Sequence, residues 1–209
     1  MTADITAVLA EARIMPVLTV PDPTTAVPLA RALSAGGARC AEVIFRTPDA
    51  EQVVKAMAGE GGLFVGAGTV LTAEQAERAM AAGACFVVSP GLDHDVIAKC
   101  RELGMPVIPG VATATEVMSA LKAGLDTVKL FPAEPLGGRA TLRALAAPFP
   151  GVRFMPTGGI NAAGLAGYLA EPAVLAVGGS WMATPALLAG GDYAEIQRLT
   201  AEAMERSAP

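Results

Sequence analysis

Several features that mark specialised classes of protein are scarce or missing in these 209 residues. The 3 cysteines, Cys40, Cys85 and Cys100, are odd in number and widely spaced, which suits buried, reduced thiols better than a disulfide framework. His94 is the only histidine, so an ordinary histidine-rich zinc site cannot be assembled. No apolar run approaches the roughly 20 residues that span a bilayer. Disulfide-rich, zinc-dependent and membrane-spanning proteins are therefore disfavoured.

Charged residues are also scarce, and the acidic ones outnumber the basic ones. Only 17% of the residues are charged, the net charge is −5, and no basic cluster interleaved with aromatic residues is present. Sequence-independent binding of nucleic acid is therefore disfavoured. Residues 1–13 carry acids early and lack a basic start followed by an apolar stretch, so we expect no signal peptide there. We expect a cytoplasmic, soluble protein that binds a small molecule, with no nucleic acid and no membrane as partner.

The chain is rich in apolar residues, which make up 53% of it, and it contains 23 glycines. This composition is typical of a compact enzyme with many tight turns. Its length suits one core, so we predict one domain over residues 1–209. Short runs with strand-like composition alternate with segments of helical period. The strand candidates are 14–20, 38–45, 63–67, 85–88, 107–109, 127–130, 152–155 and 174–177.

The helix candidates fill the intervals between these strands. They are 24–35, 49–58, 73–82, 93–103, 115–123, 139–146, 162–169 and 193–206, and a short N-terminal helix precedes them. Four helices end at glycines suited to a left-handed cap: Gly36-Gly37, Gly83, Gly104 and Gly124. Strict alternation predicts an α/β fold, a single (β/α)8 TIM barrel, with the chemistry at the carboxyl ends of the strands. A doubly wound open sheet is the alternative.

The first unusual residue is Lys129, which lies inside an apolar strand candidate. Burying an ammonium ion is costly unless the ion is paired or deprotonated. A deprotonated amine is a nucleophile toward ketones. The strand alone favours a lysine that reaches solvent or pairs with a core carboxylate, so the neighbouring residues must decide.

Glu42 is a second charge inside a strand candidate, and Arg46 follows four residues later on the same strand face. A carboxylate that faces a buried lysine can exchange protons with a bound ketone and its water. The alternative is that Glu42 and Lys129 form a purely structural ion pair. The guanidinium of Arg46, a rigid fork of donors, suits the carboxylate of an α-keto acid.

Two glycine pairs follow the last two strand candidates, in Pro156-Thr-Gly-Gly-Ile160 and Val177-Gly-Gly-Ser-Trp181. Turns without side chains let backbone N–H groups converge on an anion, and the loops after strands seven and eight form the usual phosphate site of this barrel. Either pair alone is most often only a turn. Both pairs at the expected positions predict a phosphate site, to which the Ser180 hydroxyl can add a donor.

The remaining motifs give no support for a metal or a cofactor. His94 is expected in the first turn of an exposed helix that Asp93 caps. The stretch Gly66-Ala-Gly-Thr-Val70 does not match the dinucleotide-binding pattern, and no P-loop is present. We therefore predict a reaction that needs no metal ion and no cofactor.

Taken together, six segments closely resemble the bacterial 2-keto-3-deoxy-6-phosphogluconate (KDPG) aldolases, which also act as 4-hydroxy-2-oxoglutarate (KHG) aldolases. The resemblance covers nearly the whole chain, in order and with similar spacing. The segments are Glu42-Val-Ile-Phe-Arg-Thr47, Gly66-Ala-Gly-Thr-Val70, Ser89-Pro-Gly91, Lys129-Leu-Phe-Pro-Ala-Glu134, Pro156-Thr-Gly-Gly-Ile160 and Gly178-Gly-Ser-Trp181.

This resemblance implies roles for individual residues. It implies that Lys129 forms a Schiff base and that Glu42 is the general acid/base. The residues implied to bind pyruvate are Arg46, Thr69, Pro90 and Phe131, and Thr157 would govern which face of the aldehyde is presented. The residues implied to bind phosphate are Gly158, Gly159, Gly178, Gly179 and Ser180. The family is typically a homotrimer.

The chain departs from the family pattern at Ile44-Phe45, where a Thr-Leu pair is common. Ile44 shares a strand face with Glu42 and removes a possible hydroxyl from the barrel interior. Substrate choice therefore stays open, because related aldolases for 2-keto-3-deoxy-6-phosphogalactonate share much of this framework.

The predicted reaction is that of a class I aldolase, a lyase. Neutral Lys129 attacks the C2 ketone of KDPG while Glu42 shuttles protons through water. The imine then accepts electrons as the C3–C4 bond breaks, which releases glyceraldehyde 3-phosphate and finally pyruvate. KHG would give pyruvate and glyoxylate. A non-catalytic barrel that binds a phosphorylated ligand and a metal-free isomerase are the alternatives.

Overall fold

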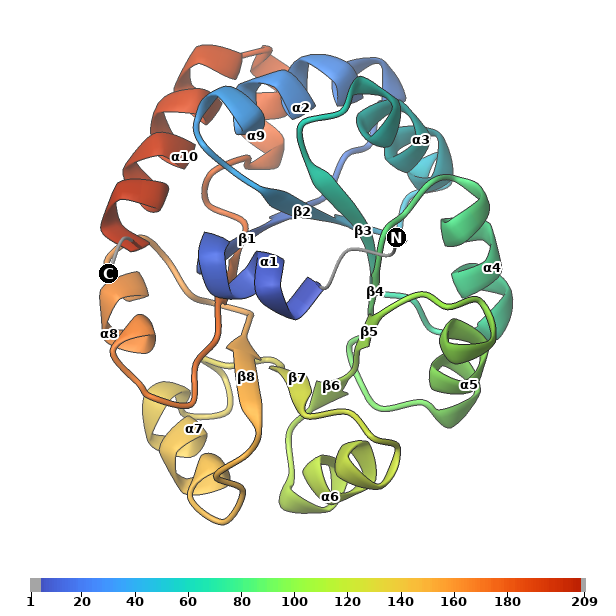
Figure 1. Cartoon of the computed structure of the whole chain (residues 1–209). Coiled ribbons are helices and arrows are strands. Elements are labelled where there is room, and N and C mark those ends of the chain that lie inside the picture. The colour runs from blue at the N-terminus through green and yellow to red at the C-terminus, as the bar shows by residue number, and fades with distance from the viewer. Residues whose placement is uncertain (1–4, 208–209) are drawn as a thin grey trace.

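The structure, a computed structural model, describes residues 5–207, with helices on the outside and strands inside (Figure 1). Part of the N-terminal stretch considered above, residues 1–4, lies outside the described residues. The strands are β1 (Ile14–Leu18), β2 (Cys40–Ile44), β3 (Phe64–Gly68), β4 (Val87–Val88), β5 (Val107–Ile108), β6 (Gly110–Val111), β7 (Thr127–Leu130), β8 (Arg153–Pro156) and β9 (Val177–Gly179).

Each strand candidate corresponds to at least one of these strands. The segment expected as a strand at 107–109 forms β5, which ends before Pro109, and a further strand that was not predicted, β6, begins directly after Pro109. Proline has no N–H to donate to a ladder, which explains the interruption. Its carbonyl still accepts a hydrogen bond of 2.9 Å from the Lys129 N–H, so the segment remains attached to β7.

The strands pair in parallel throughout the described residues. A curled six-stranded sheet has the order β5-β4-β3-β2-β1-β9, and a three-stranded sheet has the order β6-β7-β8 (Figure 1). Isolated parallel bridges join Phe154 to Val174 and Thr157 to Gly178. The predicted α/β fold with parallel strands is confirmed. A doubly wound sheet does not fit, because the order β5 to β1 is sequential and lacks its central reversal.

The helices also follow the expected order. They are α1 (Ile5–Ala12), α2 (Ala26–Ala35), α3 (Ala50–Glu60), α4 (Ala73–Ala81), α5 (His94–Glu102), α6 (Ala114–Lys122), α7 (Gly138–Ala146), α8 (Leu165–Leu169), α9 (Pro185–Gly190) and α10 (Tyr193–Ser207), with a 3-10 turn at Pro23–Thr25. The short helix α9 was not predicted. Its six residues span fewer than two turns, too few for a periodic pattern.

The expected glycine caps fix the orientation of the loops. Gly37, Gly83, Gly104 and Gly124 have φ angles of 91°, 96°, 64° and 75°. This left-handed conformation is the usual end of a helix that turns back into a strand. The turns from helix to strand therefore share one end of the molecule, and the carboxyl ends of the strands face the other end.

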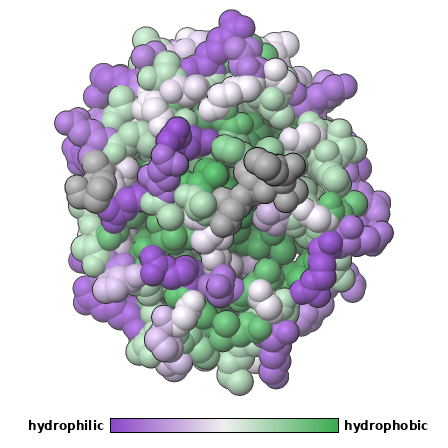
Figure 2. All heavy atoms as spheres, in the orientation of Figure 1, coloured by the Kyte–Doolittle hydropathy of each residue, from purple (hydrophilic) through white to green (hydrophobic). Residues whose placement is uncertain are grey.

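Helix α1 covers the end of the strands where these turns lie. In Figure 1 it crosses the middle of the view, in front of the strands. Its buried residues Ile5, Leu9 and Ala12 belong to one core cluster with Met15 of β1 and Met155 of β8. On this face, hydrophilic residues are most frequent at the periphery (Figure 2). With this end covered, the opposite end is where a ligand can enter.

The cysteines correct one prediction. Cys40 and Cys100 are buried and free, as expected, and burial raises the pKa of Cys40 to about 12 and that of Cys100 to about 11. The expectation that Cys85 is buried is wrong, because its side chain is exposed just before β4. Within residues 5–207, no helix has both the length and the apolar character needed to cross a membrane.

Candidate active site

The two charges predicted inside strands meet in the interior. Lys129 of β7 is 4% exposed and Glu42 of β2 is 0% exposed. The Lys129 Nζ lies 2.9 Å from Oε1 and 3.3 Å from Oε2 of Glu42. Lys129 therefore does not reach solvent, and the pair connects the six-stranded sheet to the three-stranded one. This geometry fits both a catalytic pair and a structural one, so the surroundings decide.

Glycines on β3 make room for the Glu42 carboxylate. A Cβ placed on Gly68 would lie 2.1 Å from Glu42 Oε1, and one on Gly66 would lie 2.1 Å from the Phe86 ring. Both glycines are therefore required by packing. The sequence alone did not reveal this role: the segment was rejected as a nucleotide motif and otherwise counted only toward the family resemblance. The signal was present, because two glycines two residues apart share one strand face.

A pocket of about 190 Å³ brings together most of the other predicted site residues. It lies at the carboxyl ends of β1, β2, β7, β8 and β9, the end predicted from the glycine caps. Its lining residues are Val17, Thr19, Ile44, Arg46, Phe131, Thr157, Gly158, Gly159, Ile160, Gly178, Gly179 and Ser180. Arg46 and Ser180 are exposed at the edge, whereas Thr157 is buried.

Phe131 connects this pocket to the buried ion pair. Its ring lines the pocket, and the Lys129 Nζ lies 5.3 Å from the ring centroid. An ammonium group at this distance from an aromatic face is stabilised by the ring quadrupole. A ligand that fills the pocket therefore lies within a few side chains of the Lys129 amine.

Thr69 and Pro90 are not among the residues that line the pocket. Thr69 directly follows Gly68, and its φ of 58° is unusual for a branched residue. The Pro90 carbonyl packs against Gly110, where an added Cβ would lie 2.2 Å from its oxygen. Gly110 in turn pairs with Lys129. Both residues are half-buried: Thr69 follows β3, which pairs with the strand of Glu42, and Pro90 packs against the partner of Lys129.

The packing of the chain itself requires the glycine pairs. Gly158 and Gly159 have φ angles of 103° and 82°. A Cβ on Gly178 would lie 2.2 Å from Thr157 Oγ1, and one on Gly179 would lie 1.8 Å from the Trp181 ring. Substitution of these glycines would disturb the fold and the site together, so Ser180 is the better residue for testing ligand binding.

Cavity size by itself does not locate this site. A larger cavity of about 350 Å³ lies beside the start of β8, lined by residues that include Leu142, Phe149 and Glu171. None of the predicted site residues lines it. We assign the site to the smaller pocket because only that pocket adjoins a buried lysine and faces the carboxyl ends of the strands.

Potential metal ligands are dispersed in the described part of the chain. No group of three or more His, Cys, Asp or Glu side chains there is placed to hold a metal ion. His94 lies at the first turn of α5, exposed, with Nε2 3.0 Å from Ser119 Oγ. The Asp93 carboxylate accepts a hydrogen bond of 2.9 Å from the Val96 N–H, which confirms the predicted cap.

Known proteins match the chain over almost its full length. The family model described as KDPG and KHG aldolase matches residues 5–199. A 2-dehydro-3-deoxy-phosphogluconate aldolase of Treponema pallidum is 50% identical over 198 residues, which cover 94% of each chain. A KHG/KDPG aldolase of Escherichia coli is 44% identical, covering 95% of this chain and 93% of that protein.

A solved structure also resembles the chain over almost its full length. A KDPG aldolase of Legionella pneumophila, with pyruvate captured as a covalent carbinolamine intermediate, superposes with a TM-score of 0.92. It is 37% identical, and the match covers 96% of this chain and 98% of that one.

Proposed function

Because the chain belongs to the KDPG and KHG aldolase family and is an aldolase, we propose that it cleaves KDPG through a Schiff base on Lys129. The products are pyruvate and glyceraldehyde 3-phosphate. We include KHG, which gives pyruvate and glyoxylate, as a second substrate. The observation that carries the proposal is the buried Lys129–Glu42 pair, with Nζ 2.9 Å from a carboxylate oxygen beside an open pocket.

The first half of the reaction builds the imine. The Lys129 amine uses its lone pair to form a bond to C2 of the substrate. The ketone oxygen takes up two protons and leaves as water. Glu42 lies within hydrogen-bond reach of the nitrogen. It can therefore accept, one after the other, the two protons that the Lys129 ammonium group loses, and pass both through water to the departing oxygen.

The second half breaks the carbon–carbon bond. The C4 hydroxyl loses a proton, the electrons of the C3–C4 bond move into the cationic imine, and the aldehyde leaves. The resulting enamine takes a proton at C3, and water then hydrolyses the imine to pyruvate and the free amine. The chain's own groups suffice for this sequence, which is why we predict no metal and no cofactor.

The pocket provides a place for the rest of the substrate. We propose that Arg46, Thr69, Pro90 and Phe131 hold the pyruvate portion. Thr157, whose side chain packs against Gly178, would set which face of the aldehyde is presented. The turns at Gly158–Gly159 and Gly178–Gly179, with Ser180, would bind the phosphate through backbone N–H groups and one hydroxyl.

We extend the proposal to the architecture and the assembly. Isolated bridges join the β8 region to the β9 region, and only Pro109 separates β5 from β6. Both features support one closed (β/α)8 barrel that forms a single domain. A homotrimer, with the exposed apolar residues Leu71, Met80, Met118 and Leu121 as candidates for its interface, is testable by analytical ultracentrifugation. The cytoplasmic location predicted from the sequence can be tested by cell fractionation.

The test is reductive trapping. Borohydride added with pyruvate should attach one reduced pyruvyl group to Lys129, located by peptide mass spectrometry, and activity should disappear, because only an imine is reducible there. Borohydride without pyruvate is the control. An unmodified mass with pyruvate present would exclude the Schiff base and leave the non-catalytic phosphate-binding barrel or the isomerase.

Substrate choice needs a separate test. Rates on KDPG, KHG and 2-keto-3-deoxy-6-phosphogalactonate, compared as kcat/KM, decide among the three. We expect KDPG to have the highest value. A higher value for the galactonate epimer would reverse that assignment without affecting the Schiff-base chemistry.

A further inference from the structure

A buried tyrosine donates a hydrogen bond directly behind the Gly158–Gly159 turn. Tyr168 of α8 is 2% exposed, and its hydroxyl donates to Glu134 Oε1 at 2.6 Å. Burial, then the hydrogen bond to Glu134, raise the pKa of the Tyr168 hydroxyl. The hydroxyl therefore stays protonated and remains a donor over the range in which enzymes are assayed.

Glu134 in turn contacts the glycine turn through both its backbone and its side chain. Its N–H donates to the Gly158 carbonyl at 3.0 Å, and the preceding Ala133 N–H donates to the Thr157 carbonyl at 2.8 Å. A Cβ on Gly159 would lie only 2.7 Å from Glu134 Cβ. The stem of Glu134 therefore packs directly against the Gly159 backbone.

We propose that Tyr168 and Glu134 are positioning residues for the Gly158–Gly159 turn, and so for the phosphate end of the substrate. This inference rests on the proposed function, because it presupposes that the turn binds phosphate. Two successive glycines with positive φ have no side chains of their own to hold them. Backbone N–H groups bind an anion well only when they are already in place, so such a turn needs support from outside.

Neither residue lines the pocket, so neither is proposed to touch the substrate. The lysine should also be insensitive to their loss. Lys129 is held within β7 by pairing with both Gly110 and Met155, and its side chain by Glu42. An effect confined to the phosphate end is therefore expected.

A second contact between the same two regions offers a matched control. Arg143 of α7 donates to Glu171, just after α8, with an Nη2–Oε1 distance of 2.6 Å. Like the Tyr168–Glu134 bond, it joins the α7 and α8 regions. Arg143 and Glu171 both line the separate 350 Å³ cavity, and neither lines the active-site pocket. Glu171→Gln thus measures the general effect of loosening these helices.

The main experiment compares Tyr168→Phe with the wild-type enzyme. We expect KM for KDPG to rise about tenfold, the worth of one hydrogen bond to a charged group. The kcat for KDPG, the kcat/KM for KHG and the rate of pyruvate trapping by borohydride should change by no more than about twofold. Glu171→Gln should leave all four values near those of the wild type.

Two substitutions of Glu134 distinguish its role in supporting the turn from any effect of its negative charge. Glu134→Gln keeps the acceptor and the stem, so it should retain a KM near the wild-type value. Glu134→Ala should raise KM at least as much as Tyr168→Phe does. The double variant should be no worse than Glu134→Ala, because Glu134→Ala already removes the contact that Tyr168→Phe removes. Thermal unfolding of each variant checks that it is folded.

The outcomes distinguish this inference from the proposed function. Wild-type enzyme that does not cleave KDPG overturns both. Wild-type enzyme that cleaves KDPG, with a Tyr168→Phe variant whose KM is unchanged or whose KDPG and KHG constants fall together, overturns the positioning role alone. Equal losses in Tyr168→Phe and Glu171→Gln would also overturn it, since they would reflect only loosened helices.

Discussion

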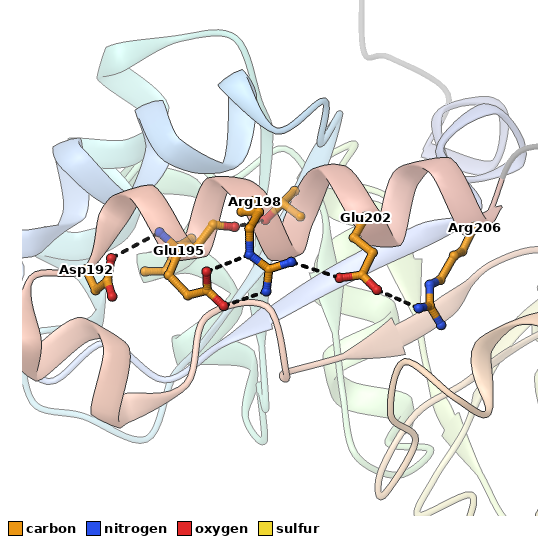
Figure 3. A network of polar contacts seen from close by, with 7 residues as sticks. Asp192, Glu195, Arg198, Glu202 and Arg206 are labelled. Atoms are coloured by element: carbon orange, nitrogen blue, oxygen red, sulfur yellow. Dashed lines mark hydrogen bonds and ion pairs between the residues drawn. The ribbon is translucent and has the colours of Figure 1, made fainter.

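The buried ion pair of the candidate active site and the ion pairs on helix α10 differ in sequence separation and in exposure to solvent. Lys129 and Glu42 come from strands 87 residues apart and are both buried. On α10, by contrast, Arg198 bridges Glu195 and Glu202, and Arg206 pairs again with Glu202 (Figure 3). The Arg198 side chain is 59% exposed.

The difference shows what each arrangement can do. Partners three or four residues apart on an exposed helix meet because the helix has that period, and water screens their attraction. A pair brought together inside the core loses its hydration, so each charge depends on the other. Only the second arrangement makes an amine sensitive to what binds beside it. The following predictions test this contrast.

Loss of the buried lysine should have the largest effect. Lys129→Met should abolish cleavage and pyruvate trapping, since no nucleophile remains. It should also lower the free energy of unfolding by about 3–5 kcal/mol, because Glu42 is left buried without a partner. Urea denaturation and activity assays measure the two effects.

A double variant separates the two effects of Lys129. Lys129→Met combined with Glu42→Gln should recover part of the stability, because the unpaired charge is gone, but no activity. If Lys129→Met alone were as stable as the wild type, the pair would not depend on mutual burial as argued here.

Loss of the buried carboxylate should have the second largest effect. Glu42→Gln should reduce kcat for KDPG by roughly 10²–10⁴-fold, the usual worth of a positioned acid/base. Slow trapping with pyruvate should persist, because the amine is still present. Turnover at the wild-type rate would remove Glu42 from the mechanism and leave it a structural partner of Lys129.

Ser180 tests whether replacing an exposed side chain always has a small effect on activity. Ser180→Ala should lower kcat/KM for KDPG by roughly 10- to 100-fold, since one charge-assisted hydrogen bond to the phosphate is lost. The loss should be confined to phosphorylated substrates, so KHG is the control. An equal loss on both substrates would mean that Ser180 only maintains the loop.

The exposed network should give the smallest effect. Arg198→Ala should leave activity unchanged and shift the urea midpoint by less than about a fifth of the Lys129→Met shift, a difference that high salt removes. Hydrogen bonds from Arg198 lower the pKa of Glu195 below its usual 4.5.

The pH dependence of stability sharpens this prediction. Because the folded-state pKa of Glu195 is depressed, its contribution is fully present above about pH 4.5 and is lost as the pH falls through the lowered value. The stabilities of the wild type and of Arg198→Ala should therefore converge as the pH falls through this lowered pKa. A gap that widens as the pH falls would contradict this assignment.

Much of the fold could be predicted because its signals are local. Alternating strand and helix patterns, and glycines at helix ends, depend on residues within a few positions of one another. The predictions failed where a local signal was weak, at the six-residue α9, or where a neighbour overrode it, at Pro109. Cys85 was misjudged because an apolar segment says little about which of its residues meets water.

The sequence by itself determined which residues stand out as candidates for chemistry: a lysine and a glutamate within apolar strands, and two glycine pairs at the ends of two others. Only the tertiary structure decided that Lys129 meets Glu42 at 2.9 Å and that Gly68 makes room for that carboxylate. It also decided that Tyr168 reaches Glu134 behind the glycine turn. Charge and backbone freedom are properties of single residues, so they can be read from the sequence. The contact between Lys129 and Glu42, which lie 87 positions apart, exists only once the strands have packed.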